Sequence, residues 1–171
     1  MTWHEIPGWF SEDDAAALLP LVRGQTVLEI GSFLGRSTAL IASAAAHVFS
    51  LDWHYRDRHT ESKGPPDTLP DLRRHIVACG LMDRVTILCG RVETLAAHLA
   101  GPFGCVFVDG AHDADSVERD TRLALRLVAP GGVVAWHDMD EPWVELGAER
   151  AGVADWQTAP PARVAWWRAP A

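Results

Sequence analysis

Residues 28–38 read LEIGSFLGRST, where a short apolar strand gives way to a turn and the turn to a helix. The turn contains Gly31 and Gly35, which allow a sharp change of direction and a close approach of the backbone to a ligand. Ser37 and Thr38 lie beside the free N–H groups at the start of the helix. The stretch therefore predicts a strand, a ligand-binding turn and a helix in succession.

Strands and helices alternate through the rest of the chain. Apolar runs predict strands at residues 26–30, 47–51, 84–90, 104–110 and 132–138, and a terminal antiparallel pair at 155–159 and 163–169. Helical patterns cover residues 11–23, 38–46, 71–81, 92–100, 113–132 with a Pro-Gly-Gly stop, and 142–150. This order predicts a single α/β domain over residues 1–171, with a Rossmann-like, doubly wound, mostly parallel seven-stranded sheet. Helices would cover both faces, and the C-terminal strands would form the antiparallel pair.

Composition limits the class of protein. Of the 171 residues, 48% are hydrophobic and 22% charged, which supplies one core and leaves too little charge for disorder. The chain has no apolar run of roughly 18 to 20 residues and no basic, apolar leader, so we expect a cytoplasmic protein without a membrane segment. The formal net charge of −8 opposes a polyphosphate partner, so nucleic acid is not an expected substrate.

One long loop interrupts the alternation. Residues 53–70 read WHYRDRHTESKGPPDTLP, a charged, histidine-rich stretch with proline and glycine and no clear hydrophobic period. We expect a mobile segment that acts as a lid or forms part of a substrate pocket. His54 and His59 lie in it and could touch a substrate.

Polar and glycine residues collect at the predicted carboxyl ends of the strands. They are Glu29 to Gly31, Asp52, Gly90, Asp109 with Gly110, and His137 with Asp138. In mostly parallel sheets, ligands bind at this edge, near the point where the strand order reverses. The sequence therefore predicts the functional site at the carboxyl edge of the sheet.

Asp52 ends the second predicted strand, where a carboxylate can accept hydrogen bonds from both hydroxyls of a ribose. The turn after the first strand lacks both the GxGxxG pattern of dinucleotide-binding proteins and the GK[ST] ending of a phosphate-binding loop. A nucleoside without a pyrophosphate fits this combination better. Two alternatives stay open: an NAD-dependent oxidoreductase, whose ribose Asp52 would also suit, and a protein that binds a cofactor without turnover.

Five segments in this order carry a resemblance to a known family. LEIGSFLGRST, SLDW, ILCGRVETL, FVDGAH and PGGVVAWHD resemble the motifs of class I S-adenosylmethionine-dependent methyltransferases along nearly the whole chain. The likeness is greatest to the small-molecule branch with a DGxH motif, which includes macrocin O-methyltransferase and, more distantly, catechol O-methyltransferase. The resemblance implies methyl transfer to a hydroxyl of a small molecule, such as a sugar or phenol of secondary metabolism.

The resemblance also implies which residues hold the cofactor. It assigns Glu29, Gly31, Ser32 and Gly35 to its methionine part, Asp52 to its ribose, Trp53 to one adenine face, and Gly90 with Arg91 to the adenine edge. Asp109 belongs to both the cofactor set and the catalytic set. Structural alternatives are a plain strand-to-helix turn for the glycines, a helix cap for Asp52 and a surface aromatic for Trp53.

His112 is the candidate general base, because it follows Asp109 by three residues in FVDGAH. A neutral imidazole has a pKa near ~6.5 and can accept a proton from a hydroxyl at physiological pH. The resemblance implies a base at this position too. The alternative is that His112 caps the helix that begins near Asp113.

Asp109 is also a candidate ligand of a divalent metal, together with His137 and Asp138. The resemblance matches Asp109, His137 and Asp138 to the metal ligands of the metal-dependent relatives. Two carboxylates suit a hard cation, but His137 departs from an all-oxygen set and puts magnesium in doubt. A nitrogen ligand tolerates Mn, Fe, Co, Ni or Zn better, or the site holds no metal and these side chains orient the substrate.

Tryptophans are concentrated in the last third of the chain, at positions 136, 143, 156, 166 and 167. Core packing or a subunit interface explains such a cluster, so a homo-oligomer is possible; an aromatic wall of the substrate pocket is the alternative. The chain holds little beyond the predicted catalytic domain. We therefore expect the substrate pocket to come from residues 53–70, the N-terminal segment and a neighbouring subunit if one is present.

Overall fold

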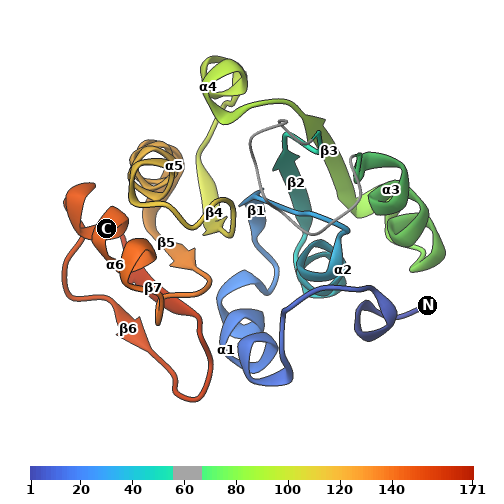
Figure 1. Ribbon diagram of the computed structural model, residues 1–171, viewed down its shortest axis with the longest axis horizontal. Coiled ribbons are helices and arrows are strands. Elements are labelled where there is room, and N and C mark those ends of the chain that lie inside the picture. The colour runs from blue at the N-terminus through green and yellow to red at the C-terminus, as the bar shows by residue number, and fades with distance from the viewer. Residues whose placement is uncertain (56–66) are drawn as a thin grey trace.

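Seven strands form one sheet in the order β3-β2-β1-β4-β5-β7-β6 (Figure 1). The strands are β1 (Thr26–Ile30), β2 (His47–Asp52), β3 (Val85–Cys89), β4 (Phe103–Val108), β5 (Val128–Trp136), β6 (Gln157–Thr158) and β7 (Ala165–Arg168). The first five pair in parallel, whereas β7 is antiparallel to both β5 and β6. The predicted seven-stranded sheet with a C-terminal antiparallel pair is confirmed.

The computed structural model describes residues 1–55 and 67–171. Within these ranges the helices are α1 (Glu12–Val22), α2 (Arg36–Ala44), α3 (Leu69–Ala78), α4 (Val92–Leu95), α5 (Ala114–Leu127) and α6 (Pro142–Arg150), with short 3-10 turns at η1 (Trp3–Glu5), η2 (Met82–Arg84) and η3 (Ala96–His98). Most of the loop expected to act as a lid lies outside the described residues. No helix of the described ranges is both long and apolar enough to cross a membrane.

Alternation of side chains along the strands builds a core on each face of the sheet. Val27 packs with residues of α1, α2 and α3, whereas the next residue, Leu28, packs with residues of α5 and α6. Successive side chains of a strand point to opposite faces, so apolar residues at adjacent positions require cover on both faces. Figure 1 shows α1 and α2 on one side of the sheet and α5 on the other.

Several element boundaries differ from the sequence prediction, and two of these differences have a clear local cause. Helix α3 begins at Leu69 rather than residue 71, with Pro70 in its first turn, where a missing N–H costs no hydrogen bond. Strand β5 begins at Val128, directly after α5, although Pro-Gly-Gly follows. The register with β4 shifts after Phe103 pairs with Val128, and Gly131 in this irregular stretch has a φ of +70°. The glycine permits a bulge, so pairing continues through it.

The tryptophans of the last third do not share one environment. Trp136 is fully buried in the core and donates a hydrogen bond from Nε1 to Thr121 Oγ1 at 2.9 Å. Trp143, at the start of α6, is 61% exposed. Core packing therefore explains Trp136 but not Trp143, because the first turn of α6 places that ring away from the sheet.

Candidate functional site

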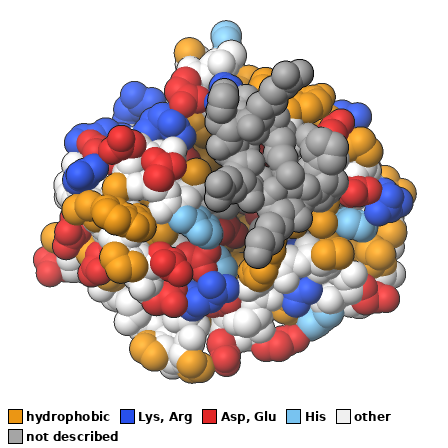
Figure 2. All heavy atoms as spheres, viewed as in Figure 1, with side chains coloured by type: hydrophobic (Ala, Val, Ile, Leu, Met, Phe, Trp, Pro, Cys, Tyr) orange, Lys and Arg blue, Asp and Glu red, His pale blue; other side chains and the backbone are white. Residues whose placement is uncertain are grey.

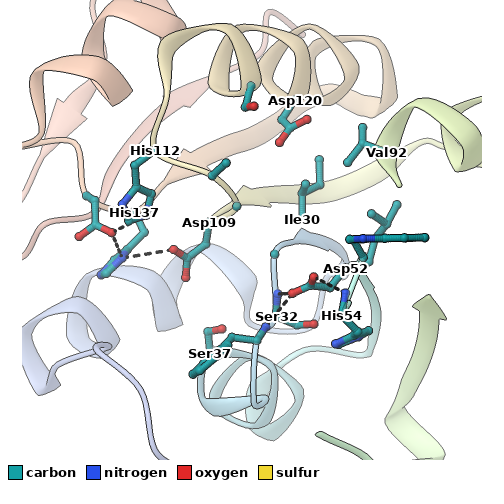
Figure 3. A pocket seen from close by; sticks show the side chains of 18 of the residues that line it. Ile30, Ser32, Ser37, Asp52, His54, Val92, Asp109, His112, Asp120 and His137 are labelled. Carbon is teal, nitrogen blue, oxygen red and sulfur yellow. Dashed lines mark hydrogen bonds and ion pairs between the residues drawn. The ribbon is translucent and has the colours of Figure 1, made fainter. Parts of the chain in front are cut away.

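The carboxyl ends of the central parallel strands surround a cavity of about 930 Å³. Its wall includes the last residues of β1 and β2 and the residues directly after β4 and β5, as the strand-edge rule predicts. Figure 2 shows histidine and acidic side chains gathering around a hollow near the middle of the face viewed. In Figure 3, Asp52 lies on one side of this cavity, and Asp109, His112 and His137 lie on the other. We call the part of the cavity around Asp52 the nucleoside-like end and the part around Asp109, His112 and His137 the acid–base end.

The two glycines of the β1–α2 turn are required by close approach of neighbouring chain segments. Gly31 has a φ of +91°, and a Cβ built there would lie 2.1 Å from the carbonyl oxygen of Asp109. Gly35 also has a φ of +91°, and its Cβ would lie 2.5 Å from Leu72 Cδ1. Gly31 lines the cavity, whereas Gly35 is not among its lining residues. Gly35 therefore shapes the turn from behind.

Asp52 holds the same turn in place. Its Oδ2 accepts hydrogen bonds from the backbone N–H groups of Ser32 and Phe33, each at 2.8 Å, and its Oδ1 accepts one from His54 N–H at 2.9 Å (Figure 3). Asp52 and Ser32 both line the cavity. Because a carboxylate offers about four acceptor sites, Asp52 can hold the turn and still accept a hydrogen bond from a ligand hydroxyl.

Glu29 lies behind the turn rather than in the cavity. It is fully buried, and its carboxyl oxygens accept hydrogen bonds from Ser37 Oγ at 2.6 Å and Thr38 Oγ1 at 2.5 Å. Burial raises the pKa of Glu29 to about 7, although the two hydroxyl donors oppose the shift. Glu29 thus joins β1 to the first turn of α2 and is not among the lining residues of the cavity.

The raised pKa of Glu29 predicts a pH-dependent stability. The folded pKa of about 7 exceeds the ordinary value of 4.5, so the folded chain binds the extra proton between these values and loses stability as the pH rises through them. Between these pH values the free energy of unfolding should change by up to about 3 kcal/mol because of Glu29, and Glu29→Gln should remove this change. Urea unfolding at several pH values measures it.

Glu149→Gln is the matched control for that experiment, because Glu149 is exposed in α6 and its substitution should leave the pH dependence unchanged. An identical pH profile for wild type and Glu29→Gln would show that Glu29 does not change its protonation on folding.

Trp53 and Arg91 form the far wall of the nucleoside-like end. The indole of Trp53 is 38% exposed, and the Arg91 guanidinium carbon lies 4.7 Å from the ring centroid. Gly90 donates its backbone N–H to the carbonyl oxygen of Asp52 at 2.9 Å, which joins the ends of β2 and β3. All four residues line the cavity together with Val92. This end therefore offers an aromatic face and an apolar side chain to a flat ligand.

His137 is the centre of the acid–base end. Its side chain is buried; Nε2 lies 3.2 Å from Asp14 Oδ2, and Nδ1 lies 3.4 Å from Asp109 Oδ1 and 3.1 Å from Asp138 Oδ2. Burial disfavours the charged ring, but hydrogen bonds to the three carboxylates outweigh it and raise the pKa of His137 to about 11. The surrounding carboxylates favour the imidazolium form of His137, whereas Arg163 Nη2, a donor 3.5 Å from Nε2, opposes it.

His112 is held by the carboxylate of Asp138. His112 Nε2 lies 3.1 Å from Asp138 Oδ2, and the His112 side chain is 53% exposed at the cavity. The hydrogen bond with Asp138 raises the pKa of His112 above its ordinary value despite partial burial. Since Nε2 donates to Asp138, Nδ1 is the nitrogen that can accept a proton from a ligand.

The alternative role of His112 as a helix cap is wrong. Asp113 is the N-cap of α5, and its side chain accepts a hydrogen bond from Ser116 N–H at 2.9 Å. A side-chain oxygen at this position satisfies an otherwise unpaired N–H of the first turn. His112 is therefore left to face the cavity.

Two residues of this end were missed by the sequence analysis. Asp14 belongs to α1, where it forms a capping box with Ser11, and Arg163 lies just before β7. Arg163 pairs with Asp138 through Nη1 and donates its backbone N–H to Asp14 Oδ1 at 2.7 Å. The capping role of Asp14 is local to α1, whereas its contact with His137 joins segments far apart in the sequence, so no local pattern indicates it.

The donor set at Asp109, His137 and Asp138 can be tested as a metal site. One ligand atom from each residue lies within 4.8 Å of the others. A metal ligand must offer a lone pair, so a cation here would have to displace any proton on His137 Nδ1, which lies 3.4 Å from Asp109 Oδ1 and 3.1 Å from Asp138 Oδ2. His137 and Arg163 already compensate the negative charge. The geometry of the three residues is compatible with a cation, but a cation would have to compete with Arg163 for Asp138.

The sequence matches a family model described as a methyltransferase domain over residues 28–139. This range runs from β1 to the residues that follow β5. It contains the Asp52 turn and the His112–Asp138 pair, and it leaves out Asp14 and Arg163.

Solved structures with a similar fold include three cofactor complexes. Cofactor-bound Rv0187 from MTB has a TM-score of 0.69 and 22% sequence identity, and the match covers 95% of this chain and 82% of that one. The O-methyltransferase TomG from Streptomyces achromogenes, involved in tomaymycin synthesis and in complex with SAM, has a TM-score of 0.66 and 20% identity, with 96% of this chain and 82% of that one covered. An O-methyltransferase from Bacillus cereus in complex with SAH has a TM-score of 0.66 and 20% identity, with 95% of this chain and 83% of that one covered. At these identities the likeness is one of fold.

Proposed function

The chain belongs to the methyltransferase domain family, and on that premise we propose that it transfers a methyl group from S-adenosylmethionine to a hydroxyl of a small molecule. One observation carries the proposal: a single cavity joins the turn held by Asp52 to the pair formed by His112 and Asp138. The first feature suits a nucleoside and the second suits removal of a proton from an acceptor.

The cofactor would lie along the carboxyl ends of β1 and β2. Ser32 and Gly31 would border its methionine part, Asp52 would accept from the ribose hydroxyls, and Trp53 would cover one adenine face. When bound, S-adenosylmethionine supplies an electrophilic methyl group on a sulfonium centre. Gly35 and Glu29 would act indirectly, by shaping the turn and by anchoring it to α2.

His112 would be the general base. Its Nδ1 would accept the proton of the acceptor hydroxyl, while Asp138 keeps Nε2 protonated and stabilises the imidazolium that forms. Arg163 holds Asp138 from the other side, which fixes the direction of the base. Asp109 would accept a hydrogen bond from the substrate hydroxyl at the same edge. Burial raises the pKa of Asp109, and the interaction with His137 opposes this shift.

We expect this reaction to proceed without a metal, because His137 and Arg163 balance the carboxylates that a divalent ion would need. The measurement is turnover and cofactor binding after EDTA treatment, with elemental analysis of the treated protein. Both should persist. Turnover that is lost on chelation and restored by a divalent ion would instead establish the metal site at Asp109, His137 and Asp138.

Replacing Asp52 by alanine should weaken binding of S-adenosylhomocysteine by about 1 to 3 kcal/mol. The substitution removes the acceptor for the ribose and for the N–H groups of Ser32 and Phe33. Calorimetric titration measures the effect, with Asp83→Ala in the exposed turn η2 as the control. An unchanged affinity would remove Asp52 from the cofactor site.

The experiment that tests the whole proposal separates it from its two rivals. Titration with S-adenosylhomocysteine and with NAD should show binding of the first alone; binding of NAD would favour an oxidoreductase. Mass spectrometry should then detect a gain of one methyl group in a panel of sugars and phenols incubated with S-adenosylmethionine. Cofactor binding without transfer to any hydroxylated acceptor would favour a non-catalytic binding protein.

A further inference from the structure

Asp120 is a buried carboxylate that the proposed mechanism leaves without a role. Its side chain comes from the second turn of α5, is 3% exposed and lines the cavity. In Figure 3 it lies across the cavity from Asp52, beside Ile30 and Val92. Burying a charged group is costly unless it is paired, so an acid at this position calls for a partner.

One oxygen of Asp120 has a partner within the protein. Oδ1 accepts a hydrogen bond from Arg119 Nε at 3.1 Å, and Arg119 Nη1 reaches Glu93 Oε1 at 2.8 Å. Within residues 1–55 and 67–171, Arg119 donates the one hydrogen bond that Asp120 receives. The second oxygen, Oδ2, faces Gly110: a Cβ built on this glycine would lie 3.3 Å from Oδ2. Gly110 therefore leaves space in front of this oxygen.

The surroundings of that space suit the edge of a flat, polar base. Trp53 and Val92 line the same end of the cavity and offer an aromatic and an apolar face, while Asp52 lies at the ribose position of the proposed function. A base stacked here must find partners for the polar atoms on its edge, since each unpaired buried polar atom weakens binding. Asp120 is buried and lies near Val92, so its carboxylate is placed to be one of these partners.

We propose that Asp120 accepts a hydrogen bond from the exocyclic amino group of the cofactor's adenine, so that the cavity selects an adenosyl cofactor over an inosyl one. The inference rests on the proposed function, because it presumes S-adenosylmethionine in the cavity. An ionised carboxylate accepts hydrogen bonds and cannot donate them, which matches an amino group and opposes the 6-oxo oxygen of hypoxanthine. Sites built around such a hydrogen bond discriminate strongly against an analogue that lacks it.

The charge of Asp120 makes the contact sensitive to pH. Burial raises the pKa of Asp120 to about 6; the neighbouring Arg119 opposes this shift, while the carboxylates of Glu93 and Asp113 add to it. Below this value the carboxyl is protonated and is a weaker acceptor for the amino group. Affinity for an adenosyl ligand should therefore fall as the pH falls through about 6.

The test compares S-adenosylhomocysteine with S-inosylhomocysteine by calorimetric titration of the full chain. Wild type should bind the adenosyl compound about 10- to 100-fold more tightly, the range expected for a hydrogen bond to a charged group. Asp120→Asn should abolish or reverse this ratio, because an amide can donate to the 6-oxo group. Asp115→Asn is the control, since that exposed acid of α5 pairs with Arg150 and is not among the cavity's lining residues.

A wild type that binds both compounds equally, or an Asp120→Asn variant with the wild-type ratio, overturns the inference while leaving the proposed function intact. If the variant does not fold, the pH series of wild type decides. Loss of affinity for the adenosyl compound alone between about pH 7 and pH 5 supports the role of Asp120, and parallel loss for both compounds overturns it. A wild type that binds neither compound overturns the proposed function itself.

Discussion

Gly31→Ala should lower the free energy of unfolding by roughly 3 to 5 kcal/mol and abolish binding of S-adenosylhomocysteine. Two costs add. A side chain at a φ of +91° is strained, and the new Cβ would lie 2.1 Å from the backbone oxygen of Asp109, which cannot move without shifting the end of β4. The turn that carries Ser32 would then be displaced from Asp52, and with it the proposed cofactor site.

Chemical unfolding measures the loss of stability, and titration with the ligand measures the loss of binding. Gly152→Ala separates the two costs, because Gly152 has a φ of +93° and nothing within 4 Å of its missing Cβ. It should cost only about 1 to 2 kcal/mol, the strain of the left-handed conformation. Equal destabilisation of the two variants would mean that the approach of β1 to Asp109 is looser than the structure shows.

His112→Ala should lower kcat by about 10² to 10⁴ and leave binding of S-adenosylhomocysteine nearly unchanged. The imidazole is half exposed at the cavity, and Asp113 caps α5, so its removal takes away the base without removing a structural contact of the helix. The control is His98→Ala, which changes an exposed histidine that is not among the lining residues of the cavity.

The pH profile identifies the base independently. His112 must be neutral to accept a proton, and its pKa lies above the ordinary value because of the hydrogen bond to Asp138. The acidic limb of kcat/KM should therefore fall above pH 6.5 in wild type, move lower in Asp138→Asn and disappear in His112→Ala. An acidic limb that persists unchanged in His112→Ala, with kcat near wild type, would assign the base to another group.

The sheet and its functional edge could be predicted from local patterns. Apolar runs such as residues 26–30 alternate with helical patterns, and this order left few arrangements for a parallel sheet. Since parallel strands end at one edge, the residues after each strand had to gather there. The predicted Asp52, Asp109, His112 and His137 indeed lie around one cavity. Pairing of β5 through Pro-Gly-Gly was not predicted, because it depends on the neighbouring β4.

The sequence does not show the protonation state of the site residues or which distant residues they contact. His137 is identified by its place after a strand, but its raised pKa depends on Asp14, more than a hundred positions earlier, and on Asp109 and Asp138. Glu29 reads as a cofactor residue from its position, yet its side chain turns away from the cavity toward α2.

Local sequence patterns are sufficient to predict the succession of strands and helices along the chain, the glycine-containing turn and the set of polar residues at one edge of the sheet. These follow from patterns within short segments and from the geometry of parallel strands. Only the folded arrangement brings Asp14 and Arg163 beside His137 and Asp138, and places Asp120 at the cavity. The physical reason is that burial and electrostatic pairing depend on distances between groups far apart in the chain, and local patterns do not contain those distances.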